Sequence, residues 1–448
     1  MANFRKDTQV FGPTGHDRNV FEVPMIANKN GEVVTTENPF PVTITQSIGY
    51  SNRSTSNDAF GRLRVSNPHT LFDSSLRYGD NVEKWSESET DNSGNSGSAH
   101  NANEGLIDLT VGESSGDSII RETKRVFSYQ PGKSLLVLNT FVMNEPKAYL
   151  RQRIGYFGAE NGVYLEQDNS SIYIVKRSKV SGSVVNTRVS QSNWNVDTLQ
   201  GDGVTSYTLD LTKAQILWSD FEWLGVGSVR VGFVINGQFI PVHIFHHANE
   251  VTTTYMTTAT LPIRYEITNT DDTGTSSTLK QICSSVMSEG GYTASSISRS
   301  VSTALTGKNI SDTADTPLIS IRLRSGRLDG VVIPKSADFY GLQGAAFAYK
   351  VYRNNSLTGA SFITSSSDSN VEYDLSATAL SGGQKIMEGV FVGDNKGGAS
   401  KISFGDMDNQ LQLTRSLGNS TGDIFTIAIR ATTNNDDAVG SLNWQEHN

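Results

Sequence analysis

The sequence has a single cysteine and no long apolar run. Cys283 stands alone among 448 residues, so an intramolecular disulfide framework is excluded. No stretch approaches the roughly 18 consecutive apolar residues that cross a bilayer, and we expect no membrane insertion. The first residues, MANFRKDTQVF, lack the apolar region and the cleavage site of a signal peptide. We therefore expect a protein that is made and assembled in the cytoplasm.

Charged side chains are also scarce. They make up 19% of the chain, against about 25% in an ordinary globular protein. The 37 Lys and Arg are outnumbered by 46 Asp and Glu, which gives a net charge of −9. Because phosphate binding depends on clustered Lys and Arg, we expect no nucleic acid as a partner. Ser, Thr, Asn and 41 Gly supply the polarity instead, and this mixture favours turn-rich β structure.

The length indicates more than one domain, because a single core stops growing at about 250–300 residues. Residues 1–58 have Pro, Gly or Asn every few positions, which leaves room only for short extended pieces. We interpret them as an extended N-terminal attachment arm. Such an arm cannot bury its own apolar side chains. We expect its phenylalanines to dock on another subunit or on the following domain: Phe4, Phe11, Phe21 and Phe40.

Residues 59–295 follow a strand pattern. Runs of β-branched and apolar residues alternate with turns, as at 106–111, 134–138, 171–175 and 228–235. Asn236-Gly237 separates two apolar runs and is a strong hairpin signal. The polar stretch 86–103 is typical of a surface loop.

The rest of the chain predicts a second β module. Residues 296–312 are rich in Ser and Thr and are predicted to be a linker. Short strand patterns with turns between them return over 313–448. The predicted fold class is therefore all-β: an extended arm followed by two β-sandwich modules of jelly-roll or lectin-like type.

The sharpest candidate for chemistry is the segment WSDFEW at 218–223. On a strand, Asp220 and Glu222 would share one face, roughly 7 Å apart by Cα. Two carboxylates about 5–9 Å apart serve glycoside hydrolysis, and tryptophans stack on sugar rings. One family of sandwich-fold glycanases has a Glu-x-Asp-x-Glu strand, but Trp218 stands where its nucleophile would be. The alternative is an exposed strand face over buried apolar residues. We favour it and expect no enzymatic activity.

Histidines cluster once, at His243, His246 and His247. In an extended strand, His243 and His247 lie about 13 Å apart on one face and His246 lies on the other. This spacing does not suit a tetrahedral metal site unless a bulge brings the histidines together. The alternative is a polar strand end. We expect no metal and no cofactor.

Six blocks of the sequence together carry a resemblance to a known family. They keep their order and span just over half of the chain. The blocks are DAFGRLRVSNPHTLFDSSLRYGD (58–80), RETKRVFSYQPGKS (121–134), RSKVSGSVVNTRVSQSNWNVDTLQGDG (177–203), LDLTKAQILWSDFEWLGVGSVRVGFVINGQ (209–238), LPIRYEI (261–267) and QICSSVMSEGGY (281–292). These blocks resemble virion structural proteins of tailed bacteriophages, especially those of marine cyanobacterial phages. The resemblance implies a non-enzymatic, multi-copy particle component, and it brings no catalytic residues. The module after residue 300 is not covered.

The expected function is a structural component of a tailed-phage virion, assembled in the host cytoplasm. It would be a fibre, a spike or a decoration on the head, neck or tail, with other virion proteins as partners. Analogy with fibre-like parts favours a homo-oligomer, with a trimer as the first expectation. One alternative is binding of a host-surface glycan through Tyr340, Tyr349 or Tyr352. A second is a glycan depolymerase that uses Asp220 and Glu222.

Overall fold

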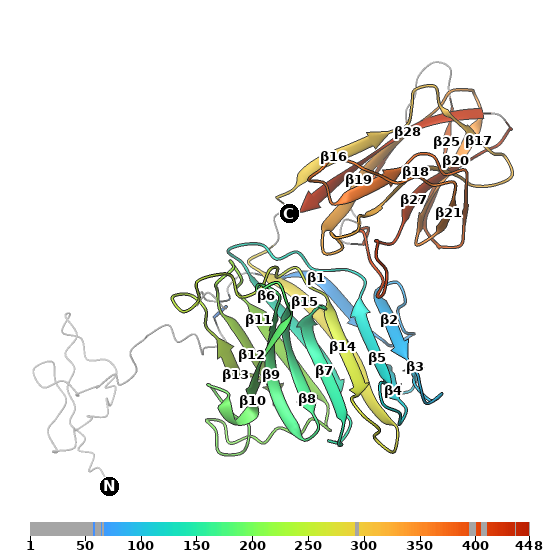
Figure 1. The fold of residues 1–448 in the computed structure, drawn as a ribbon. Helices are drawn as coiled ribbons and strands as arrows, with labels where there is room; N and C mark the ends of the chain where they lie inside the picture. Colours follow the sequence, from blue (N-terminus) through green and yellow to red (C-terminus); the bar gives the residue numbers. More distant parts are fainter. Residues whose placement is uncertain are drawn as a thin grey trace, which may run out of the picture. The chain divides into compact units, whose positions relative to one another are not determined.

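The computed structural model describes residues 57–58, 64, 67–291, 295–393, 400–404, 410–434 and 436–447, which all belong to one compact unit. Within these ranges the chain is built from β-strands with one short 3-10 helix, Gln191–Asn193, so the all-β prediction is confirmed (Figure 1). The four phenylalanines of the predicted arm lie outside the described residues. No helix in the described part is long and apolar enough to cross a membrane.

The first module is a sandwich of two antiparallel sheets. Within the described residues, one sheet has the order β13-β12-β11-β6-β15-β4-β3, with β1 beside β15, and the other has the order β10-β9-β8-β7-β14-β5-β2. The strands are β1 (His69–Ser75), β2 (Trp85–Thr90), β3 (Gly97–Asn101), β4 (Leu106–Val111), β5 (Ser118–Thr123), β6 (Ser134–Val142), β7 (Leu150–Phe157), β8 (Gly162–Asp168), β9 (Ser171–Ser178), β10 (Val185–Ser190), β11 (Gln215–Phe221), β12 (Val229–Ile235), β13 (Gln238–Phe245), β14 (Ile263–Asn269) and β15 (Ser277–Glu289).

Alternation along each strand creates the core between the two sheets. In β14, Ile263, Tyr265 and Ile267 are fully buried in the core cluster, whereas Arg264 and Glu266 point to the other face. The same period of two recurs in the neighbouring strands. One face of each sheet is therefore apolar, and the opposite face is free to carry polar groups.

The hairpin at Asn236-Gly237 is confirmed. It joins β12 to β13, with Ile235 opposite Gln238. The backbone φ angles of Asn236 and Gly237 are 51° and 76°. Two successive positive φ values define a type I′ turn, whose twist matches that of the flanking strands.

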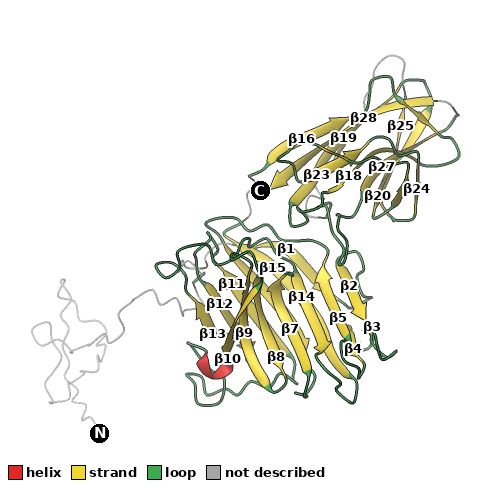
Figure 2. Ribbon diagram, in the orientation of Figure 1, coloured by secondary structure: helices red, strands yellow, loops and turns green. Residues whose placement is uncertain are grey.

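The second module is also a sandwich of two sheets (Figure 2). Within the described residues, one sheet has the order β16-β28-β19-β26 with β17 beside β28, the other has the order β22-β23-β18-β27-β20-β25, and β21 pairs with β24. The strands are β16 (Ile297–Ser302), β17 (Lys308–Ile310), β18 (Thr316–Leu323), β19 (Val331–Gly341), β20 (Ala346–Arg353), β21 (Ser356–Thr358), β22 (Ile363–Thr364), β23 (Val371–Asp374), β24 (Ala379–Ser381), β25 (Gln384–Val392), β26 (Ser400–Ser403), β27 (Phe425–Ala431) and β28 (Asp436–His447).

The prediction that residues 296–312 form a linker is wrong. This segment carries β16 and β17, which both pair with β28 and belong to the second module. Val301 and Ile310 face the core of that module, while the intervening Ser and Thr side chains lie on the outer side or in the turn. Likewise, the polar stretch 86–103 contains most of β2 and all of β3.

The segment after residue 410 returns to the first module. Gln412 Nε2 donates to the carbonyl of Val126 at 2.8 Å, and the Leu417 amide donates to Ser86 Oγ at 2.9 Å. Arg415 donates to Glu122 in β5 at 2.7 Å. These contacts extend a polar layer of the first module, which is described below.

Gly232 in β12 gives a direct test of the packing in the first module. It lies opposite Trp218 of β11, and a Cβ at this position would lie 2.6 Å from the Trp218 ring and would collide with the carbonyl of Ile240. We expect Gly232→Ala to lower the free energy of unfolding by about 3 kcal/mol in chemical denaturation. Gly344→Ala is the control, because nothing lies within 4 Å of its added Cβ. Equal stability of the two variants would contradict this packing.

Candidate functional site

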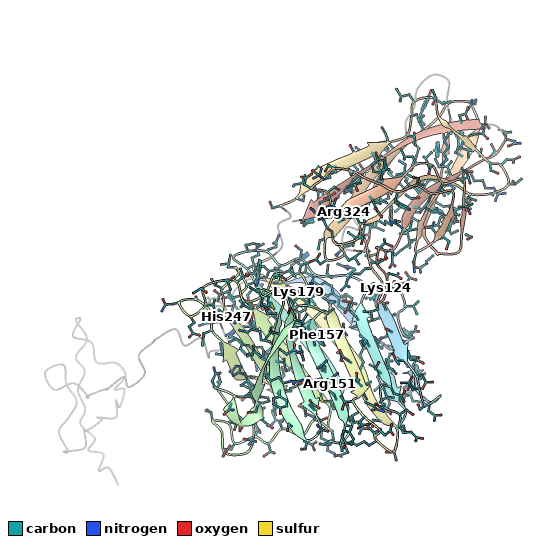
Figure 3. All side chains as sticks on the ribbon, viewed as in Figure 1. Lys124, Arg151, Phe157, Lys179, His247 and Arg324 are labelled. Atoms are coloured by element: carbon teal, nitrogen blue, oxygen red, sulfur yellow. The ribbon has the colours of Figure 1, made fainter. Side chains whose placement is uncertain are left out.

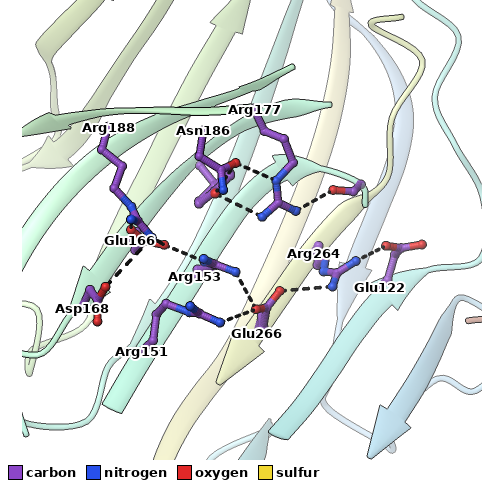
Figure 4. A network of polar contacts seen from close by, with 12 residues as sticks. Glu122, Arg151, Arg153, Glu166, Asp168, Arg177, Asn186, Arg188, Arg264 and Glu266 are labelled. Atoms are coloured by element: carbon purple, nitrogen blue, oxygen red, sulfur yellow. Dashed lines mark hydrogen bonds and ion pairs between the residues drawn. The ribbon is translucent and has the colours of Figure 1, made fainter. Parts of the chain in front are cut away.

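A layer of alternating charges covers the outer face of the sheet formed by β2, β5, β14 and β7–β10. We call it the Arg–Glu ladder (Figure 4). It arises from strand alternation, because each strand that buries apolar or amide side chains inward carries its charged residues on the other side. The ladder consists, in spatial order, of Arg188, Glu166, Arg153, Glu266, Arg264, Glu122 and Arg415.

The centre of the ladder is Arg153, which lies between two carboxylates. Its Nε is 2.6 Å from Glu166 Oε2, and its Nη1 is 2.8 Å from Glu266 Oε1. Arg188 reaches Glu166 from β10, with Nε 2.6 Å from Oε1. Glu166 is fully buried, and Arg153 and Glu266 are nearly so. Charges this deep are tolerated only when they are paired.

The other half of the ladder continues the alternation. Arg264 places Nη2 3.1 Å from Glu266 Oε2 and Nη1 3.3 Å from Glu122 Oε2. Arg415 then contacts Glu122 Oε1 at 2.7 Å. Glu166 and Glu122 are therefore each shared by two arginines, and Glu266 by three, because Arg151 also lies 4.0 Å from its Oε1.

Aromatic rings close the layer beside the charges. Phe157 and Tyr164 lie with ring centroids 4.3 Å apart, and the guanidinium of Arg177 lies over both rings, at 5.4 and 5.1 Å (Figure 3 labels Phe157). Arg177 also donates to Tyr164 Oη at 3.2 Å. Cation–π contacts of this kind are stronger where water is excluded. This outer face is thus a packed layer of side chains.

The arginines of the ladder hold its glutamates in hydrogen-bonded ion pairs, an arrangement that does not suit proton transfer to a substrate. Burial raises the pKa of Glu122, against the opposing effect of Arg415 and Arg264. Burial acts the same way on Glu266, but its arginine neighbours outweigh it and the pKa is lowered. Glycoside hydrolysis needs one carboxylic acid to donate a proton and a second carboxylate that is free to attack or to activate water. Here each glutamate already accepts hydrogen bonds from arginine.

Asp220 lies in a different place, on the outer face of the sheet that contains β11. It is fully buried, with Oδ2 2.5 Å from both Arg64 Nη2 and Arg230 Nη2, and Ser134 Oγ donates to its other oxygen. Strand β11 ends at Phe221, and the Glu222 amide opens a turn by bonding to the Ser228 carbonyl. The predicted exposed pair of Asp220 and Glu222 is therefore replaced by a buried ion cluster. Sequence analysis did not identify Arg64 and Arg230 as partners of Asp220.

The histidines are used separately. His247 Nε2 lies 2.9 Å from Lys176 Nζ. Because an ammonium only donates, Nε2 accepts and Nδ1 donates to the Gly227 carbonyl at 2.6 Å. The His247 ring also stacks on Tyr255 at 3.8 Å. His243 Nδ1 instead accepts from the Asn195 amide at 3.3 Å. Burial lowers the pKa of His243 and of His247 to about 4. In the described part of the chain, no group of three or more His, Cys, Asp or Glu is arranged to hold a metal ion.

The three tyrosines do not form a shared platform. Tyr349 of β20 packs against the core of the second module, with its ring 5.6 Å from that of Phe339. Tyr352, which is also on β20, donates to Asp315 at 2.6 Å. Tyr340 is on β19, which belongs to the other sheet.

The comparisons with known proteins concern the fold alone. The sequence matches no protein family model and no curated protein. Similar solved structures include the Emp47p carbohydrate recognition domain (11% identity, 50% of this chain, 97% of that one, TM-score 0.31) and the legume lectin-like domain from Entamoeba histolytica (10% identity, 51% and 100%, TM-score 0.31). A Bacteroides ovatus GH16 protein from a mixed-linkage glucan locus matches with 9% identity, 48% and 99% coverage and a TM-score of 0.33.

Arg153 and Arg188 give a matched test of the ladder, because both bind Glu166 but only Arg153 is buried. We expect Arg153→Met to lower the free energy of unfolding by about 3–5 kcal/mol, because it leaves Glu166 and Glu266 facing each other without their shared cation. Arg188→Met should cost less than about 1 kcal/mol, because its side chain is 39% exposed. Urea denaturation at pH 7 measures both values. Equal losses would contradict the ladder as described.

The buried histidines predict acid sensitivity. Unfolded histidines titrate near pH 6.5, whereas the folded pKa of His243 and of His247 is about 4. The unfolded state therefore binds more protons between these values, and stability falls as the pH drops from about 6.5 towards 4, by at most about 1.4 kcal/mol per pH unit for each histidine.

His247→Asn keeps a donor for Gly227 and should roughly halve the slope of stability against pH between about 6.5 and 5. His246→Asn is the control, since His246 is exposed. Denaturant unfolding at several pH values gives the slopes, and an unchanged slope in His247→Asn would contradict the assignment.

Proposed function

We propose that this protein is a non-enzymatic structural component of a tailed-phage particle, attached to a neighbouring subunit through its N-terminal arm. The proposal rests on one observation above all. Arg64, which lies six residues after the end of the predicted arm, is fixed to the first module by ion pairs with two carboxylates.

Arg64 is the central group of this anchor. It contacts Asp220 of β11, and its Nε lies 2.9 Å from Glu289 Oε2 of β15. The carbonyl of Asn57 accepts from Arg64 Nε at 3.1 Å and from Arg230 Nη2 at 2.6 Å. A subunit held in a particle by an extended arm needs such a firm attachment where the arm meets the folded module.

The anchor also coincides with the phage resemblance. Arg64 lies in block 58–80, Asp220 and Arg230 lie in block 209–238, and Glu289 lies in block 281–292. The blocks therefore contain residues that are distant in the sequence but meet in one ion cluster. This supports the view that the resemblance reflects a shared way of mounting the arm.

The two alternatives receive less support. A depolymerase that uses Asp220 would need this carboxylate to reach a substrate, but both of its oxygens already accept hydrogen bonds inside the protein. Glycan binding through the tyrosines would need a shared surface, and Tyr340 and Tyr352 lie on different sheets. The structural role is the function that the geometry supports best.

Two N-terminal deletions test the proposal. Deletion of residues 1–56 should keep the stability of the folded modules, because Asn57 and Arg64 remain, and should abolish incorporation into particles. Deletion of residues 1–66 removes the anchor as well. This longer deletion should lower the free energy of unfolding by about 1–3 kcal/mol, since Asp220 loses one charged hydrogen-bond donor.

Tagged versions are expressed during infection by a tailed phage that carries this gene, and purified particles are probed for the tag. The full-length protein is the positive control, and circular dichroism confirms that the deletion variants fold. Normal incorporation of the protein lacking residues 1–56 would overturn the arm hypothesis. Absence of the full-length protein from particles would overturn the structural role itself.

A further inference from the structure

A cavity of 330 Å³ opens where the Arg415 end of the ladder meets the loops around residues 158–161 and 326–329. Its apolar lining comes from Val126, Leu261, Pro262 and Leu328. Its polar lining includes threonine hydroxyls and two carboxylates. We propose that this cavity binds a small, uncharged, hydroxyl-rich ligand, such as one sugar unit of a glycan. The proposal does not depend on the particle role.

The first wall of the cavity is held in place by hydrogen bonds. Asn161 is buried, donates to Thr257 Oγ1 at 2.6 Å and accepts from the Thr257 amide at 3.1 Å. The Gly158 amide donates to the Asn161 carbonyl at 2.9 Å, and Arg177 donates to the Gly158 carbonyl at 3.0 Å. Small-molecule sites are usually formed before the ligand arrives, and this wall meets that condition.

The opposite wall is a tight turn of the second module. The Arg327 amide donates to the Arg324 carbonyl at 3.1 Å, and the Gly330 amide donates to the Arg327 carbonyl at 3.1 Å. Arg327 Nη1 further donates to the Asp368 carbonyl at 2.6 Å. Gly326 has a φ of 79°, which suits glycine at the tip of the turn. Asp329 is thereby held at the cavity.

The charges and the apolar lining of the cavity together favour a neutral ligand. Arg415 is already paired with Glu122, and Glu160 is paired with Lys179. Within the described residues, no group hydrogen-bonds to or pairs with the carboxylate of Asp329. An anionic ligand would be repelled by this carboxylate, and a cationic one would have to give up its hydration against the apolar lining.

The hydroxyl groups of a ligand match the hydrogen-bonding capacity that the side chains of the cavity retain. The two oxygens of Asp329 can accept from two adjacent hydroxyls of one ligand, as carboxylates do. Thr258 Oγ1 accepts from the Thr260 amide at 3.0 Å and keeps its own proton to donate. Pro262 and Leu328 offer an apolar surface for the C–H face of a sugar ring. The volume is near the lower end of the range of about 300–1,000 Å³ for small-molecule sites, which favours a single ring.

Saturation-transfer NMR on the full chain tests the proposal with glucose, galactose, mannose and N-acetylglucosamine as neutral probes. Galacturonate and glucosamine serve as charged probes. We expect at least one neutral sugar to bind with a Kd of about 1 mM and to give a stronger signal than either charged sugar. Asp329→Asn should weaken binding by about tenfold or more, because a charged acceptor is lost. Thr258→Val should weaken it less.

Asp73→Asn is the matched control, because Asp73 is 82% exposed and does not line the cavity. It should leave the signal unchanged. Absence of transfer from every neutral sugar at about 20 mM, well above the expected Kd, would overturn the proposal. Equal binding by wild type and Asp329→Asn would also overturn it, as would preferential binding of galacturonate. A protein that binds a sugar but fails to enter particles would support this site and contradict only the structural role.

Discussion

Arg153 and the two glutamates that it bridges impose a constraint on the whole first module. Glu166 lies on β8 and Glu266 on β14, on either side of the strand that carries Arg153. Both buried carboxylates accept hydrogen bonds from this one guanidinium, and it reaches both only when the register of three strands is correct at once. A slip of one residue would move Arg153 into the core and leave two buried anions. The ladder therefore constrains the register of the strands as well as pairing buried charges. The flanking Arg264 and Arg188 extend this constraint on register to β5 and β10.

Strands were predictable from the sequence because their signal is local. The period-two pattern around Tyr265 and the Asn236-Gly237 turn need no information from elsewhere in the chain. The segments 86–103 and 296–312 were missed because their strands are short and have few buried apolar residues among many polar ones. Val301, the single buried residue of β16, acquires meaning only once β28 lies beside that strand. Composition cannot distinguish such strands from loops.

The candidate sites were less predictable, since their partners are far apart in the sequence. Asp220 looked like one half of a local pair with Glu222, yet its partners come from residues 64, 134 and 230. The alternation Arg-x-Arg in β7 and Arg-x-Glu in β14 was visible, but not that these strands lie side by side. The histidine cluster failed to assemble for the same reason: hydrogen bonds from Lys176 and Asn195 draw the rings into different surroundings.

The position of the Arg64 anchor has a mechanical consequence. Asp220 and Glu289 lie on β11 and β15, and β6 hydrogen-bonds to both of these strands. A pull applied at residue 64 would therefore be shared between β1, which follows in the chain, and the interior strands β11 and β15, each of which is held on two sides. Force applied to an edge strand such as β13 could open its ladder one hydrogen bond at a time, whereas force on β11 or β15 must shear several bonds together. The anchor therefore distributes tension over several neighbouring strands of the sheet.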